Sequence, residues 1–150
     1  ENTDKHQRFT SLLMTYYYLD TSIWLDLFEE REETHLSKYT FVRKLLDKIM
    51  QSNGFIVYSK IILNELVDIG YTFYELHELF KPYKPFLIYV SYNQRHAGKA
   101  RDLARKRNVP LADAFHALLA REHKAVLVSR DRDFKQLQDI TIAQTPEELL

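Results

Sequence analysis

The chain contains no cysteine, which excludes disulfides, thiolate metal sites and cysteine nucleophiles together. Glycine occurs only three times, at Gly54, Gly70 and Gly98. These glycines lie too far apart in the sequence to build a glycine-rich phosphate loop, so a P-loop and a dinucleotide fingerprint are also excluded. A chain without cysteine fits a reducing compartment, and we expect a cytoplasmic protein.

Long hydrophobic runs are absent as well. No window holds the roughly 18 apolar residues that a membrane-spanning helix requires, so we expect no membrane partner. The 21 basic and 21 acidic residues cancel, which counts mildly against a nucleic-acid binder unless bound metal offsets an acidic site. Residues 1–14 lack the apolar core of a signal peptide. We interpret them as an N-terminal extension or a cloning remnant, and 15–150 as one domain.

The sequence does contain short apolar segments that alternate with helical patterns. Strands are predicted at residues 16–19, 55–58, 86–90, 125–128 and 140–142. Helices are predicted between them, the first capped by Ser22 and a later one carrying Pro110 in its first turn. Short, continuously apolar strands separated by helices are typical of a parallel sheet covered on both faces. We therefore predict a three-layer α/β/α sandwich with about five parallel strands.

Four carboxylates fall where the site of such a fold is expected, because ligands bind beyond the carboxyl ends of parallel strands. Asp20 ends the first predicted strand and Asp131 follows the fourth. Asp113 lies in the first turn of one helix and Glu65 within the first two turns of another, so both are able to face the same edge. A single acid is explained equally well by a helix dipole, a capped turn or solvent exposure. The four together favour a site.

The segments around these acids resemble the motifs of the PIN-domain family, in the same order. Residues 18–22, Tyr-Leu-Asp-Thr-Ser, resemble the opening motif, and Glu65 is similar to the second acid of the family. Residues 110–114, Pro-Leu-Ala-Asp-Ala, resemble the third motif, and residues 127–134 resemble the fourth. The resemblance covers about residues 16–142 and is nearest to the VapC-like toxin ribonucleases of type II toxin–antitoxin pairs.

The resemblance implies an endoribonuclease that cuts single-stranded RNA with Mg²⁺ or Mn²⁺. The implied catalytic and metal-binding residues are Asp20, Glu65, Asp113 and Asp131. Ser22 and Ser129 are candidates for hydrogen bonds that orient these carboxylates. The chemistry agrees, because crowded carboxylates stay ionised only beside a cation, and oxygen ligands suit these two metals better than zinc. The alternative within the family is a PIN domain that is not a toxin and acts in RNA processing or mainly as a binding module.

Two residues near these acids have more than one interpretation. Asp133 is either a fifth acid of the cluster or the N-cap of a helix that starts at Phe134, and we favour the cap. His116 lies one turn beyond Asp113, and we interpret it as a partly buried polar residue rather than a catalytic one.

Basic residues supply candidate contacts to RNA. One predicted helix and its end carry Arg95, Lys99, Arg101, Arg105, Lys106 and Arg107. An RNA backbone and a solvated helix face explain this helix equally well. Arg130 and Arg132 flank Asp131 and are better placed to meet a scissile phosphate.

The resemblance also implies partners. It predicts a homodimer and an antitoxin that binds a groove between the early helices. The candidate groove residues are Trp24, Phe28, Tyr71, Phe73 and Tyr74, although core packing is the default explanation for most of them.

Two other families that gather acids at strand ends are excluded. A phosphatase of the haloacid-dehalogenase kind requires a second Asp two residues after the first, where this chain has Ser22. A response-regulator receiver requires an Asp at the end of the third strand, and residues 90–93, Val-Ser-Tyr-Asn, contain none.

Overall fold

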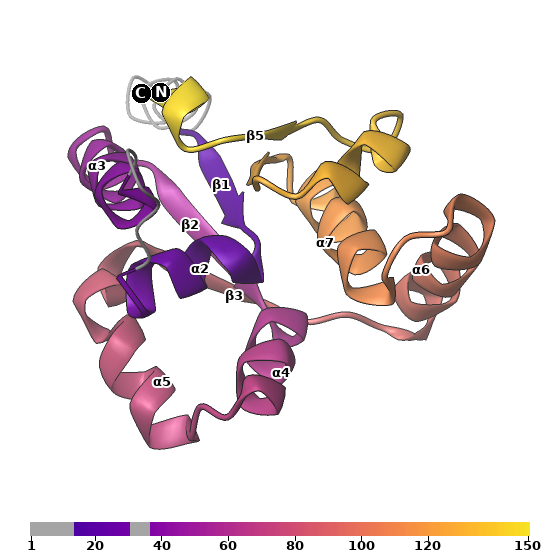
Figure 1. The fold of residues 1–150 in the computed structure, drawn as a ribbon, viewed down its shortest axis with the longest axis horizontal. Coiled ribbons are helices and arrows are strands. Elements are labelled where there is room, and N and C mark those ends of the chain that lie inside the picture. The colour runs from indigo at the N-terminus through magenta and orange to yellow at the C-terminus, as the bar shows by residue number, and fades with distance from the viewer. Residues whose placement is uncertain (1–13, 31–36) are drawn as a thin grey trace, which may run out of the picture.

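Five parallel strands form one sheet in the order β3-β2-β1-β4-β5 (Figure 1). The computed structural model describes residues 14–30 and 37–150, so most of the predicted N-terminal extension lies outside it. The strands are β1 (Tyr16–Leu19), β2 (Phe55–Ser59), β3 (Leu87–Val90), β4 (Ala125–Val128) and β5 (Ala143–Gln144). Every pairing is parallel, which confirms the predicted sheet.

Helices cover both faces of this sheet. They are α2 (Thr21–Phe28), α3 (Lys38–Gln51), α4 (Lys60–Ile69), α5 (Phe73–Phe80), α6 (Gln94–Arg107) and α7 (Leu111–Glu122). The chain moves outward from β1 through β2 to β3, then returns to the other side of β1 for β4 and β5. Right-handed crossovers put helices on opposite faces when the direction reverses. Accordingly, α6 and α7 lie across the sheet from α3 and α5 (Figure 1). The fold is the predicted α/β/α sandwich.

The strand order also fixes where a ligand site belongs. Because the direction of winding reverses at β1, the carboxyl ends of β1 and β4 flank a topological switch point. β1 and β4 are paired from Tyr16 opposite Ala125 to Leu19 opposite Val128. The residues that follow these two strands therefore lie next to each other, although more than a hundred positions separate them in the sequence.

Three predicted boundaries are wrong. Residues 140–142 form no strand, because the backbone N–H groups of Ile140 and Thr141 both bond to the carbonyl of Leu137 and bend the chain into a turn. The fifth strand begins afterwards, at Ala143. The N-cap of α2 is Asp20 rather than Ser22. Pro110 has extended backbone angles and precedes the first turn of α7 instead of occupying it.

The core is formed by the central strands and the inner faces of the helices. Trp24 is fully buried and packs edge-on against Phe80, with ring centroids 4.7 Å apart. Phe28 contacts the rings of Trp24, Tyr71 and Phe80. Among the helices of residues 14–30 and 37–150, none is long and apolar enough to cross a membrane.

Candidate metal centre

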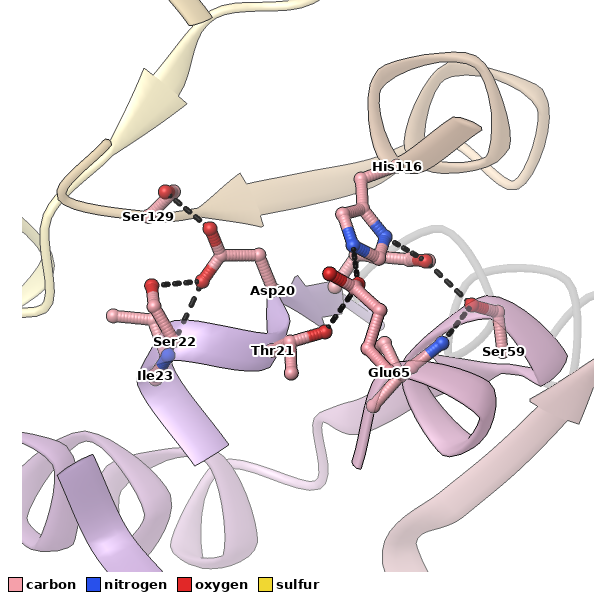
Figure 2. Close-up of polar contacts among 10 residues, drawn as sticks. Asp20, Thr21, Ser22, Ile23, Ser59, Glu65, His116 and Ser129 are labelled. Carbon is pink, nitrogen blue, oxygen red and sulfur yellow. Dashed lines mark hydrogen bonds and ion pairs between the residues drawn. The ribbon is translucent and has the colours of Figure 1, made fainter. Parts of the chain in front are cut away.

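Asp20 lies at the carboxyl end of β1, where three groups donate hydrogen bonds to its carboxylate (Figure 2). Ser22 Oγ and the backbone N–H of Ile23 donate to Oδ1, at 2.7 and 3.2 Å. Ser129 Oγ, which follows β4, donates to Oδ2 at 2.5 Å. The residue is only 4% exposed. Burial raises the pKa of Asp20, while the hydrogen bonds from Ser129 and Ser22 oppose the increase. These donors hold the carboxylate in one orientation.

Asp113, Asp131 and Asp133 form one group of carboxylates. One carboxylate oxygen from each lies within 4.8 Å of the others. Asp113, on the first turn of α7, is 8% exposed, and its Oδ2 is buried with no hydrogen-bond partner. Burial raises the pKa of Asp113 to about 7, and the charges of Asp131, Asp20 and Asp133 contribute to this increase. This carboxylate oxygen is unpaired and surrounded by like charges. A divalent cation that prefers oxygen ligands would supply the missing positive charge.

The prediction that Asp133 is an N-cap is wrong. The short helix after β4 is a 3-10 helix that begins at Arg132, two residues earlier than expected, and its N-cap is Asp131. The backbone N–H of Asp133 donates to Asp131 Oδ1 at 2.9 Å. The cap therefore orients Asp131, while the side chain of Asp133 joins the group of three aspartates. The Asp-Arg-Asp spacing was the sequence signal for this pair.

Glu65, on α4, is held separately from the three aspartates. Its Oε1 accepts hydrogen bonds from Thr21 Oγ1 at 2.6 Å and from His116 Nε2 at 2.7 Å (Figure 2). Burial by itself raises the pKa of Glu65, but the hydrogen bond and electrostatic field of His116, with the bond from Thr21, lower it. Glu65 is thus fixed by residues adjacent to two other acids, since Thr21 follows Asp20 and His116 lies one turn beyond Asp113.

His116 is more buried than the sequence suggested. Its side chain is enclosed, with 1% of the residue exposed. Nδ1 lies 2.7 Å from the hydroxyl of Tyr18, which lies 2.6 Å from Ser59 Oγ. Helical spacing relates His116 to Asp113, but no local pattern points to Tyr18, which is 98 positions away.

The four basic residues that are candidates for RNA contact differ in whether their side chains already form ion pairs. The guanidinium of Arg130 is held by Glu147, with Nη1 2.5 Å from Oε1. Its Nε also lies 3.5 Å from a carboxylate oxygen of Asp26. By contrast, Arg132, Arg95 and Lys99 are exposed, and none of them has an ion pair within the described part of the chain.

Most of the predicted groove residues belong to the core. Trp24, Phe28 and Tyr71 contact one another or their aromatic neighbours. Phe73 and Tyr74, at the start of α5, are instead 76% and 75% exposed. Phe73 also lines a cavity of about 370 Å³ between α4, α5 and β3.

Comparison with known proteins identifies a family and a fold. A family model described as PIN domain matches residues 17–140. No curated protein matches the chain. The solved structures that are similar in fold include the VapBC2 complex of Rickettsia felis bound to a promoter DNA fragment, with TM-score 0.64 and 17% identity over 87% of this chain and 98% of that one. VapBC-1 of nontypeable Haemophilus influenzae has TM-score 0.61 and 21% identity over 89% and 99%. A toxin–antitoxin complex of Klebsiella pneumoniae has TM-score 0.57 and 21% identity over 87% and 97%.

Proposed function

This chain belongs to the PIN-domain family, and on that premise we propose that it is a Mg²⁺- or Mn²⁺-dependent endoribonuclease that cuts single-stranded RNA. Family membership supports a nuclease, which is a hydrolase of phosphodiester bonds. The proposed metal dependence rests on one observation. Asp113 has a buried oxygen without a partner, and it lies in a group of three aspartates whose oxygens are within 4.8 Å of one another.

The proposed metal ligands, direct or through water, are Asp20, Glu65, Asp113 and Asp131. Asp133 is the remaining acid of the group. Such a cation, when bound, acidifies a water molecule and stabilises negative charge on the leaving oxygen. The protein's own contribution is orientation. Ser22 and Ser129 fix the carboxylate of Asp20, and the backbone N–H of Asp133 fixes that of Asp131.

We propose that exposed basic residues contact the RNA. Arg132 lies between Asp131 and Asp133 in the sequence, so it is a neighbour of the acids that would bind next to a phosphate. Arg95 and Lys99 add positive charge on α6. Arg130 reaches a phosphate only after its ion pair with Glu147 opens. Charge reversal at Arg132 is expected to weaken RNA binding more than charge reversal at Arg130, which a salt titration of binding tests.

We further propose that the chain is the toxin of a VapBC-type pair, that it acts in the cytoplasm, and that it forms a homodimer. The similarity in fold to VapBC complexes supports this choice. The exposed rings of Phe73 and Tyr74 offer apolar surface to an antitoxin. The alternative remains a PIN domain that processes RNA or mainly binds it. Growth arrest on expression, relieved by a neighbouring gene, favours the toxin, and the absence of arrest favours the alternative.

Cleavage of a labelled single-stranded RNA by the purified protein, with Mn²⁺ or Mg²⁺, tests the proposed activity. Asp20→Asn removes one ligand charge and is expected to abolish cleavage, as is a chelator. Asp47→Asn is the matched control, because Asp47 is exposed on α3, a helix that carries none of the proposed ligands. Cleavage that survives both Asp20→Asn and chelation contradicts the proposal.

A further inference from the structure

His116 forms hydrogen bonds through both of its ring nitrogens, one to Tyr18 of the sheet and one to Glu65 of the acidic site. The ring lies between β1 and α4, with Nδ1 2.7 Å from Tyr18 Oη and Nε2 2.7 Å from Glu65 Oε1 (Figure 2). Tyr18 in turn contacts Ser59 Oγ at 2.6 Å. Ser59 accepts the backbone N–H of Ile62 and so caps α4, the helix that carries Glu65.

The hydrogen bonds of this network can all be donated in one direction, from Ser59 to Glu65. A carboxylate only accepts, so Nε2 of His116 donates to Glu65. Nδ1 is then able to accept from the hydroxyl of Tyr18, and that hydroxyl is able to accept from Ser59. A phenolic hydroxyl both donates and accepts, so Tyr18 is able to do both at once. Each group from Ser59 to Glu65 therefore donates to the next.

The two donors to Glu65 converge on the same oxygen. Thr21 Oγ1 and His116 Nε2 both bond to Oε1, at 2.6 and 2.7 Å. No hydrogen bond to Oε2 is found within residues 14–30 and 37–150. A free glutamate side chain samples many rotamers, and ordering it costs conformational entropy. Two bonds to Oε1 select one rotamer and leave Oε2 available to a ligand.

The network also ties Glu65 to the other proposed ligands. Tyr18 and Thr21 bracket Asp20 on β1 and α2, and His116 follows Asp113 by one turn of α7. A shift of α4 relative to these elements would break bonds to Thr21 or His116. The distance between Glu65 and the acids of the other elements is thereby fixed.

From this arrangement we propose that His116 is a positioning residue of the metal centre, which aims Glu65 at the cation and is itself locked by Tyr18 and Ser59. The inference rests on the proposed function, since it gives Glu65 a cation to bind. His116 acts through Glu65 and does not contact the cation or the RNA. Its role is distinct from that of a polar residue that only completes the core.

Calorimetric titration of Mn²⁺ into the metal-free protein tests the role without relying on activity. His116→Phe removes the donor to Glu65 and is expected to weaken Mn²⁺ binding about 10- to 100-fold. His116→Gln keeps an N–H donor and is expected to recover most of the affinity. His96→Gln is the matched control, because His96 contacts Glu122 between α6 and α7, outside the site.

A double-mutant cycle separates positioning from general damage. If His116 acts through Glu65, adding His116→Phe to Glu65→Ala weakens Mn²⁺ binding no further. Equal losses in both backgrounds overturn the proposal, as does wild-type affinity in His116→Phe. If His116→Phe does not fold, Tyr18→Phe provides the cycle, since it removes the hydroxyl that locks Nδ1 of His116 with little change of shape.

The reference variant Asp113→Asn distinguishes failure of this inference from failure of the proposed function. If wild-type protein binds no Mn²⁺, or binds it as well after Asp113→Asn, the metal centre itself is wrong. If Asp113→Asn abolishes binding while His116→Phe leaves it unchanged, only the positioning role is wrong.

Discussion

Replacing Asp113 by Asn is expected to stabilise the metal-free protein at pH 8 and to weaken its binding of metal. At this pH the wild-type side chain is a buried carboxylate with an unpaired oxygen, and Asp131 and Asp133 repel it. An amide of the same shape carries no charge, and its NH₂ group is able to donate to a neighbouring carboxylate. The substitution therefore removes repulsion and adds a partner, at the expense of a ligand for the cation.

The size of this effect follows from the pKa of Asp113. An increase from 3.8 to about 7 corresponds to at most ~4 kcal/mol, at about 1.4 kcal/mol per pH unit. Solvent screens the exposed Asp131 and Asp133, so we expect a gain of about 1–3 kcal/mol. The native state binds this proton more tightly than the unfolded state does. The contribution of Asp113 to wild-type stability therefore falls as pH rises from about 4 to about 7 and is constant above that window.

Urea denaturation with a chelator at several pH values between 4 and 8 measures the difference between wild type and Asp113→Asn. The two proteins are expected to have similar stability at pH 4 and to diverge up to about pH 7. Adding Mn²⁺ at pH 8 should reverse the order, because a ligand that binds only the native state stabilises wild type and not the variant. A variant that is less stable than wild type without metal at pH 8, or a difference independent of pH, refutes the reasoning.

Three further substitutions test the surroundings of the site and the backbone. Ser129→Ala removes the donor to Oδ2 of Asp20 and should destabilise the protein by about 1.5–3 kcal/mol in urea denaturation at pH 7; an unchanged midpoint contradicts this role for the hydrogen bond. Gly98 lies within α6 with no atom within 4 Å of an added Cβ, so Gly98→Ala should stabilise the protein by about 0.5–1 kcal/mol. Gly70 ends α4 with φ at 127°, and Gly70→Ala should destabilise it by about 1 kcal/mol or more. Thermal unfolding of Gly98→Ala and Gly70→Ala checks whether their shifts have opposite signs.

Elements with a strong local signal were predictable from the sequence. The strand at 125–128 was found at the predicted residues, because a continuous apolar run is encoded within a few positions. The first helix cap was less predictable, since Asp20, Thr21 and Ser22 are all suitable cap residues. Only the structure shows that Asp20 caps the helix while Ser22 donates to it.

The parts of the site that the sequence could not supply are those that depend on distant contacts. Asp131 and Asp133 are two residues apart, and which of them caps the helix depends on where the 3-10 helix starts. The role of His116 depends on Tyr18 and Glu65, which come from other elements and become its neighbours only through the strand order.

The two buried polar residues of α7, Asp113 and His116, differ in whether the protein itself supplies their hydrogen-bond partners. Residues from Asp113 to Ala120 are all buried, so neither Asp113 nor His116 is able to turn toward solvent without unpacking the helix. A buried polar atom without a partner costs about 1–3 kcal/mol, and more if it is charged. Both nitrogens of His116 find partners within the protein, whereas Oδ2 of Asp113 finds none. Since the packing of α7 prevents Asp113 from relieving this cost by moving, the carboxylate must either take up a proton or acquire a cation. The pH dependence and the metal dependence of stability are therefore two measurements of the same unsatisfied oxygen.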